Sequence, residues 1–281
     1  MIPIIRRRNP KKNSPKKVQR PNWITSNVML EHFMQRLSKL LEWLRENKDS
    51  NLKLEILDTL DEVQEILMDY DSTHELNTFS DLNIFLEYMT LTDMDIKIRA
   101  VDCISSSFIH NTIFKFTSQN FDLRHYVDLI IRNSATPEYC IALIGMLETI
   151  VVNGKKAAGP LVNLLLSTRC YIKVFQIDSH ICHLKFMDLL KSIQTVSNDL
   201  FSPLVNFDLL CVLALVIVND NLAKSCVSIL LALSESSIKA IREDNKMFKV
   251  FYLLVEVMLH YLNGNDLYKI YIFRDRILYL K

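Results

Sequence analysis

Glycine is scarce in this chain, with only four among 281 residues, and four of the seven prolines lie before residue 22. Because these two residue types supply most tight turns, a body with so few of them favours helices over a turn-rich β fold. The same scarcity argues against a glycine-rich loop that would hold a phosphate with backbone amides. No nucleophile elbow and no helical His-Glu metal motif is present in the sequence either. We therefore do not expect an enzyme.

Long hydrophobic runs are also missing. The most apolar run, LLCVLALVIV from Leu209 to Val218, has ten residues, which suits a buried helix better than a membrane span. The start, MIPII, is too short for the core of a secretory signal, and basic residues follow it. Asn-x-Ser/Thr sequons are absent as well. We expect no membrane contact and a cytoplasmic protein, with the endoplasmic reticulum lumen as the alternative if the N-terminus is incomplete.

The six cysteines are scattered through helical patterns, so they are expected to be small buried apolar groups rather than a disulfide framework. One compact cluster of metal-ligand types exists, HICH with Asp178 before it. Its two histidines, His180 and His183, could share one helical face, but no second Cys/His pair with zinc-site spacing follows. A polar segment between helices is the favoured interpretation. No metal and no cofactor is expected.

Charge is distributed unevenly along the chain. Residues 1–20 hold eight Lys and Arg and no acid, whereas the remainder has 25 basic and 32 acidic residues. We expect a basic disordered arm over 1–22, an N-terminal helical pair over 23–70 and a repeat array over 71–281. A solvated arm is the simplest interpretation, with nuclear targeting or contact with RNA or an acidic partner as alternatives. Because no aromatic is interleaved with these charges before Trp23, nucleic-acid binding is disfavoured.

Helical periodicity runs through the body. Apolar residues recur at 30, 33, 34, 37, 40, 41 and 44, and again at 52, 56, 57, 60, 63, 66 and 67. No run alternates apolar and polar residues as a strand would. Further helices are expected at 183–197, 222–234, 245–262 and 266–280.

Helix boundaries are marked by capping residues. In DYDSTHELNTFSDLNIFLEYM, Ser72 with Glu75 forms a capping-box pair that starts a short helix. That helix is expected to end at Phe79-Ser80-Asp81, with Ser80 capping the next one. Thr92 with Asp95 resembles a further cap. Thr136-Pro137-Glu138 places a proline at the first helical position, and that helix should stop near Gly154.

Similar segments return at intervals of about 40 residues. LNIFLEYM begins at Leu82, LRHYVDLI at Leu123 and LVNLLL at Leu161, while residues 98–111 align with 140–153 at an offset of 42 that pairs Ala100 with Ala142. A helical period near 40 is typical of armadillo and HEAT repeats. The fold class we expect is therefore all-α, an armadillo/HEAT-like right-handed α-solenoid in which each repeat buries its apolar face against its neighbours.

Residues 55–115 resemble the armadillo-type nucleotide-exchange factors of the 70-kDa heat-shock chaperones, a family with a cytosolic branch and an ER-lumenal branch. The resemblance is carried by the segments LDEVQEILMDYDSTHELNTFSDLNIFLEYM and MDIKIRAVDCISSSFIHN. Matching positions are Asp71, Glu75-Leu76, Phe79, Leu82, Arg99-Ala100, Ile104 and Asn111. Where the family has a Gly-Gly pair this chain has Ser80-Asp81, the family's Asn-Ala is Ser72-Thr73, and its helix glycine is Ser105.

The resemblance implies a co-chaperone that embraces one lobe of the ATPase domain of such a chaperone and promotes ADP release. We expect a monomer. In armadillo repeats the third helix lines the concave face. On that basis Ala100, Cys103 and Ile104 should face the core. The candidate partner-binding residues, expected to face solvent, are Arg99, Asp102, Ser106, Ile144 and Glu148. Two alternatives stay open: an armadillo scaffold that binds another protein or peptide in its groove, and a nucleic-acid-associated protein that uses the basic arm.

Overall fold

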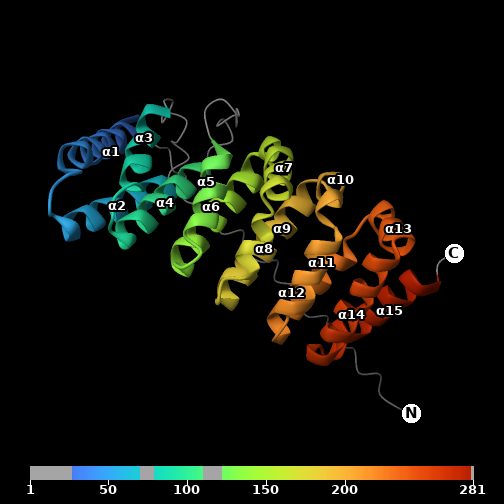
Figure 1. Ribbon diagram of the computed structural model, residues 1–281. Coiled ribbons are helices and arrows are strands. Elements are labelled where there is room, and N and C mark those ends of the chain that lie inside the picture. Colours follow the sequence, from blue (N-terminus) through green and yellow to red (C-terminus); the bar gives the residue numbers. More distant parts are fainter. Residues whose placement is uncertain (1–26, 70–78, 110–121, 280–281) are drawn as a thin grey trace, which may run out of the picture.

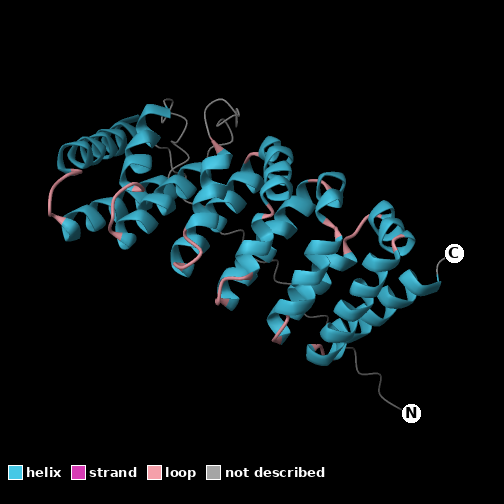
Figure 2. Ribbon diagram, in the orientation of Figure 1, coloured by secondary structure: helices cyan, strands magenta, loops and turns pink. Residues whose placement is uncertain are grey.

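The chain forms an elongated stack of helices, as Figure 1 shows. The computed structural model describes residues 27–69, 79–109 and 122–279. Within these ranges the regular elements are all helices, and no strand is present (Figure 2). The expected all-α class is confirmed.

The helices differ in length, and the longest have sixteen or more residues. In chain order they are α1 (Asn27–Asn47), α2 (Lys53–Asp69), α3 (Phe79–Tyr88), α4 (Met94–Ile109), α5 (Leu123–Arg132), α6 (Pro137–Asn153), η2 (Lys155–Ala157), α7 (Ala158–Thr168), α8 (Cys170–Phe175), α9 (His180–Val196), α10 (Asn198–Phe201), η3 (Ser202–Leu204), α11 (Phe207–Val216), α12 (Asp220–Leu231), α13 (Glu235–Glu243), α14 (Asn245–Tyr261) and α15 (Gly264–Tyr279).

The helices are arranged in rows. One row consists of α2, α4, α6, α9, α12 and α15, each packed against the next; we call it the inner row. A second row runs through α5, α8, α11 and α14. From Ala158 onward three helices make one repeat: α7–α8–α9, then α10–α11–α12, then α13–α14–α15. Stacked three-helix units of this kind form an α-solenoid, as the repeat spacing predicted.

Burial repeats along the inner row at steps of 40 or 43 residues. Each of the eight buried residues of α6 lies 43 positions before a buried residue of α9. Six of the buried residues of α9 in turn lie 40 positions before the six buried residues of α12. Between α4 and α6 the step is again 43, so Ala100 corresponds to buried Leu143 and not to half-buried Ala142. The predicted offset of 42 was therefore wrong by one residue.

Neighbouring repeats are also joined by polar contacts inside the core. The buried amide of Gln194 on α9 donates to the carbonyl of Ile229 on α12 at 3.0 Å. The thiol of Cys103 on α4 donates to the carbonyl of Leu60 on α2 at 3.3 Å. Five of the six cysteines are buried, Cys211 is half-buried, and all six are free thiols, as expected. Burial raises the pKa of the Cys226 thiol to about 12, which keeps it protonated.

Several predicted boundaries need correction. Residues 70–78, which hold Ser72 and Glu75, lie outside the described residues, and α3 already begins at Phe79, so Ser80 is inside a helix rather than its cap. Asp93, not Thr92, caps α4, because its Oδ1 accepts from the amides of Asp95 and Ile96. Pro137 does open α6, and Gly154 ends it.

The HICH cluster starts a helix instead of forming a polar segment between helices. His183 is buried, its Nε2 lies 2.8 Å from the carbonyl oxygen of Ile177, and its ring contacts Phe175. Burial lowers the pKa of His183 below its ordinary value. His180 is exposed. These residues anchor the start of α9 and do not converge.

The apolar run from Leu209 is only partly buried. Leu209, Leu210 and Leu213 are in the core, whereas Leu215 is 78% exposed. Within the described ranges no single helix is long and apolar enough to cross a membrane. Two consecutive segments, Asn198–Leu204 and Phe207–Val216, are together long and apolar enough, but the chain bends by 80° between them.

A hydrogen bond at the N-terminal end offers a test of this packing. The hydroxyl of Tyr88, whose side chain is fully buried, donates to the carbonyl of Leu44 on α1 at 2.8 Å. Tyr88→Phe should lower the free energy of unfolding by about 1 kcal/mol, because the carbonyl loses a buried partner. Tyr252→Phe, at a residue that is 44% exposed, is the control and should stay within about 0.5 kcal/mol of the parent. Urea denaturation followed by circular dichroism measures both, and equal effects would contradict the assignment.

Candidate partner-binding face

The inner-row helices α4, α6 and α9 are each covered on two sides by their neighbours in the row, and each leaves one narrow strip of side chains uncovered. On α4 the strip runs through Ile98, Asp102, Ser105 and Ile109, at helical spacings of four, three and four. The same strip continues on α6 and α9. We call it the ladder face, and its members on those two helices are Ile141, Gly145, Glu148, Thr149, Val152, Leu184, Lys185, Asp188, Lys191 and Ser192.

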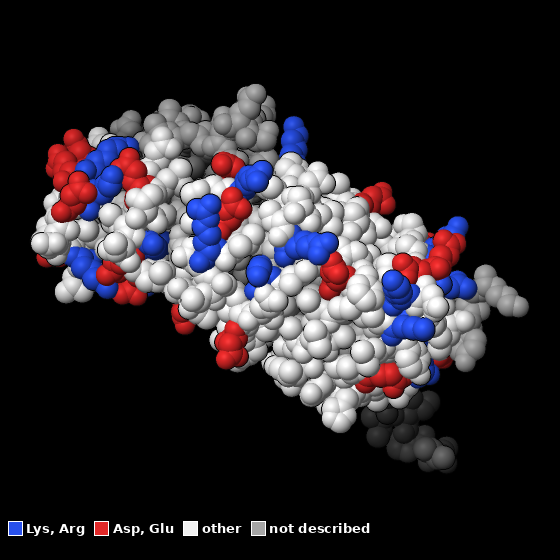
Figure 3. All heavy atoms as spheres, viewed as in Figure 1, with Lys and Arg blue, Asp and Glu red and all other residues white. Residues whose placement is uncertain are grey.

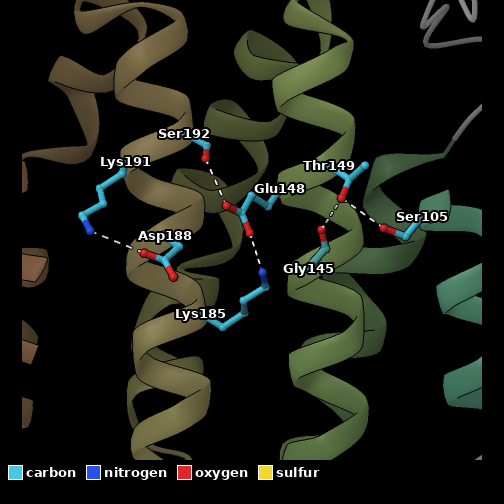
Figure 4. Close-up of polar contacts among 8 residues, drawn as sticks. All are labelled: Ser105, Gly145, Glu148, Thr149, Lys185, Asp188, Lys191 and Ser192. Carbon is cyan, nitrogen blue, oxygen red and sulfur yellow. Dashed lines mark hydrogen bonds and ion pairs between the residues drawn. The ribbon is translucent and has the colours of Figure 1, made fainter. Parts of the chain in front are cut away.

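Hydrogen bonds link the strips of successive repeats. The hydroxyl of Ser105 on α4 donates to the hydroxyl of Thr149 on α6 at 3.0 Å, and Thr149 donates to the Gly145 carbonyl (Figure 4). One repeat further on, the Ser192 hydroxyl donates to Glu148 at 3.3 Å. Both links join residues 44 positions apart. The same two positions are thus linked twice, although the donor lies on the first helix in one link and on the second helix in the other.

An ion pair reinforces the second step. Lys185 Nζ lies 2.7 Å from Glu148 Oε2, with the two side chains 35% and 22% exposed. Lys185 crosses directly over Gly145, where an added Cβ would lie 3.1 Å from Lys185 Cε. The absence of a side chain at Gly145 therefore gives Lys185 its route to Glu148. A weaker pair, Lys191 with Asp188 at 3.4 Å, extends the polar centre along α9.

Arg99 connects α2 and α4. Its guanidinium lies 2.9 Å from Asp61 and 3.8 Å from Asp102. Burial raises the pKa of Asp102 against the opposing effect of Arg99. Side chains around this pair are between 31% and 45% exposed, so solvent screens the attraction.

Apolar side chains flank the polar centre on both sides. Ile98, Ile141 and Leu184 are half-buried, at equivalent positions of three successive helices. Toward the other end of the helices Ile109 is 39% exposed and Val152 is 52% exposed. A surface with hydrogen-bonding groups between two apolar margins suits an extended polypeptide, whose backbone needs polar partners and whose side chains need apolar ones.

The structure places some of the residues singled out from the sequence where they were predicted and others not. Ala100, Cys103 and Ile104 face the core as predicted. Arg99, Asp102 and Glu148 lie on the uncovered side of the inner row, and their contact with a partner stays a prediction. Ser106 and Ile144, expected to face solvent, are 2% and 0% exposed, so that expectation was wrong.

The reason is geometric. One residue turns a helix by about 100°, so the offset of 42 moved the equivalent of Asp102 from Gly145 to buried Ile144. Ser106 is buried because α4 packs between α2 and α6. This packing leaves only about one residue per turn of α4 accessible to solvent. Sequence reasoning therefore missed Ser105, Gly145, Thr149 and Ser192. An offset of 43 would have found the last three.

Other potential sites are less developed. Among the described residues no group of three or more metal-ligand side chains converges. A recess of about 350 Å³ lies between the segments before α2 and α4 and is lined by Lys48, Lys53 and Asp93, among others. Its lysines are already engaged: Lys48 pairs with Glu87 at 2.9 Å, and Lys53 with Asp93 at 2.8 Å.

Comparisons with known proteins bear on the fold. No protein-family model matches this chain, and no curated protein matches it. Solved structures do. A designed armadillo repeat protein aligns over 86% of this chain and 99% of its own, with a TM-score of 0.62 and 12% identity. A second, in complex with the peptide (KR)4, has a TM-score of 0.63 and 13% identity over the same shares. The fold is an armadillo solenoid. A computationally designed armadillo protein for modular peptide recognition aligns with a TM-score of 0.63, at 12% identity over 85% of this chain and 98% of its own.

Gly145 and Gly264 provide a matched pair of substitutions. Gly145→Ala should raise the free energy of unfolding by about 0.5–1 kcal/mol, because alanine favours the middle of α6 and the flexible end of Lys185 can shift. Gly264→Ala should lower it by about 1 kcal/mol, because Gly264 has φ of +57°. Urea titration of both variants measures the two signs. A destabilised Gly145→Ala would mean that Lys185 cannot move aside.

Proposed function

We propose that this protein is a non-catalytic armadillo scaffold that binds an extended segment of a protein partner across the ladder face. The observation that carries the proposal is the repeated link between strips, Ser105 to Thr149 and Glu148 to Ser192, with exposed apolar residues beside it. Such a face offers polar groups at regular steps along a chain laid across the helices.

The contacts leave binding capacity at each step. Lys185 uses one of its three ammonium protons on Glu148, and hydroxyl oxygens such as that of Ser105 accept as well as donate. Ile109 and Val152 add apolar area that water now covers. Support from outside the chain comes from a designed armadillo protein of the same fold that is in complex with a peptide.

A selection experiment tests the proposal. Twelve-residue random peptides displayed on phage are selected on the full chain, and enriched sequences are synthesised and titrated by fluorescence anisotropy. Val152→Arg places a long cation on the ladder face at a site that is 52% exposed, and it should weaken binding by about tenfold or more. Leu215→Arg, on α11 outside the inner row and 78% exposed, is the matched control and should leave affinity within about twofold.

The two variants together decide the outcome. Peptides that bind the parent and Val152→Arg equally would place the binding surface elsewhere and refute this function. Equal loss in both variants would point to charge alone. Circular dichroism of each variant confirms that the helices are retained.

A finer candidate is nucleotide exchange on a 70-kDa heat-shock chaperone in the cytoplasm. The resemblance over residues 55–115 favours it, and the described part of that segment presents Asp102 on the ladder face with Arg99 next to it. The chain would bind the open form of the chaperone's ATPase domain better than the closed form and so speed ADP release.

Release of a fluorescent ADP analogue from purified cytosolic and ER chaperones tests this candidate. We expect the release rate to increase at saturating protein. If the chain binds the chaperone with equal affinity in ADP and in ATP and does not speed release of the ADP analogue, the exchange function is refuted. The scaffold function would remain consistent with that result. Imaging of a C-terminally tagged chain tests the compartment.

A further inference from the structure

Charge is unevenly compensated along the inner row. On α2 four carboxylates follow one another at spacings of three, four and three: Glu55, Asp58, Glu62 and Glu65. The buried residues of α2 correspond to those of α4 at a step of 40, so these acids occupy the positions of Asp95, Ile98, Asp102 and Ser105. The ladder face therefore continues onto α2 as an acidic strip.

Few of these acids are neutralised by the protein itself. Glu62 pairs with Arg36 of α1, and the adjacent Asp61 pairs with Arg99. Among the described residues Glu55, Asp58 and Glu65 have no ion pair, and Asp58 and Glu65 are exposed. Three like charges on one helix face repel one another modestly, which a cationic partner would relieve.

The other end of the face is different. On α9 Lys185 is held by Glu148 and Lys191 by Asp188, and on α12 Lys224 lies 2.8 Å from Asp220. Each cation there already has a carboxylate. In the space-filling view charged side chains crowd the end of the molecule that α1 and α2 form, while the lower middle of that view is largely uncharged (Figure 3). The cations of α9 and α12 are thus compensated, whereas three acids of α2 are not.

Apolar groups lie next to the acidic strip. Ile98 on α4 and Ile141 on α6 are half-buried and occupy the position that Asp58 has on α2. A chain that crosses from α2 to α6 meets unpaired carboxylates first and isoleucines next. Packed helices are about 8–10 Å apart, and an extended chain advances about 3.3 Å per residue. Each step between helices therefore takes about three residues.

We propose that the partner segment is basic and apolar, about eight to ten residues long, with Lys or Arg over Asp58 and Glu65 and an aliphatic side chain over Ile98 and Ile141. This proposal rests on the scaffold function above and specifies its ligand. Charge complementarity selects the basic residues and sets the direction of the chain, because α2 carries three carboxylates that have no ion pair among the described residues, and α6 carries one, Glu138. The aliphatic contacts supply affinity that salt does not screen.

Three labelled octapeptides separate these contributions: (Lys-Ile)4, (Lys-Ser)4 and (Glu-Ile)4, titrated by fluorescence anisotropy against the full chain at low and moderate salt. We expect (Lys-Ile)4 to bind about tenfold more tightly than (Lys-Ser)4, and (Glu-Ile)4 to bind weakest. Raising the salt concentration from about 50 to 300 mM should weaken both lysine peptides, since exposed charges are screened within about 10 Å or less.

Charge reversals locate the site. Asp58→Lys combined with Glu65→Lys should weaken (Lys-Ile)4 by about tenfold or more, and it breaks no ion pair among the described residues. The matched control is Glu42→Lys combined with Glu46→Lys, two exposed acids on α1 that lie away from the inner row. It changes total charge equally and should alter affinity by less than about threefold. Equal loss in both pairs would mean non-specific attraction and overturn the assignment.

Two further outcomes are informative. If phage-selected peptides lose affinity with Val152→Arg but are neither basic nor affected by the α2 reversals, the scaffold function stands and this ligand assignment fails. Replacing Arg6, Arg7 and Arg8 with serine in the full chain tests whether its own basic segment is the occupant. A rise in (Lys-Ile)4 affinity of about tenfold in that variant would overturn the assignment to a separate partner; unchanged affinity supports it.

Discussion

The packing of α4, α6, α9 and α12 between two inner-row neighbours constrains the rest of the structure. Because α4 lies against both α2 and α6, and α6 against both α4 and α9, eight residues of α4, of α6 and of α9 are withdrawn from solvent. Burial of that many side chains per repeat, most of them apolar, is what stabilises a solenoid, since no repeat has a core of its own. As a consequence, only one strip of side chains on each of these helices stays accessible to solvent.

That strip explains why the polar contacts recur. Once the step between α4, α6 and α9 is fixed at 43 residues by core packing, side chains at equivalent positions must face one another in the same way. Ser105 with Thr149 and Glu148 with Ser192 are the result, both separated by 44 residues. Lys185 passes over position 145 to reach Glu148, and the absence of a side chain there leaves it room. The polar contacts of the ladder face therefore follow from the 43-residue step that packing of the buried residues imposes.

The sequence predicted the helical class and the solenoid, because amphipathic periodicity and a period near 40 depend only on which residues are apolar. Site residues needed finer information. Shifting one residue rotated Ile144 into the predicted face, and the choice of Thr92 over Asp93 shows the same sensitivity at a helix start. Similarity between Ala100 and Ala142 was too weak to fix the register, since a small residue packs almost anywhere. Burial of eight residues per helix fixes it without ambiguity.

Specificity in such a scaffold follows from which groups remain uncompensated. Lys185 is paired with Glu148, and Lys191 with Asp188. A partner that binds one of these groups would have to break the existing ion pair, so the net gain in binding free energy would be small. Asp58 and Glu65 carry no such cost, because nothing has to leave before a cation arrives. In the proposed scaffold the compensated half of the face would supply backbone contacts, and the α2 half would determine which sequence binds and in which direction. The fold is shared with designed armadillo proteins at 12–13% identity, so a ligand specific to this chain would be selected by such side chains and not by the fold.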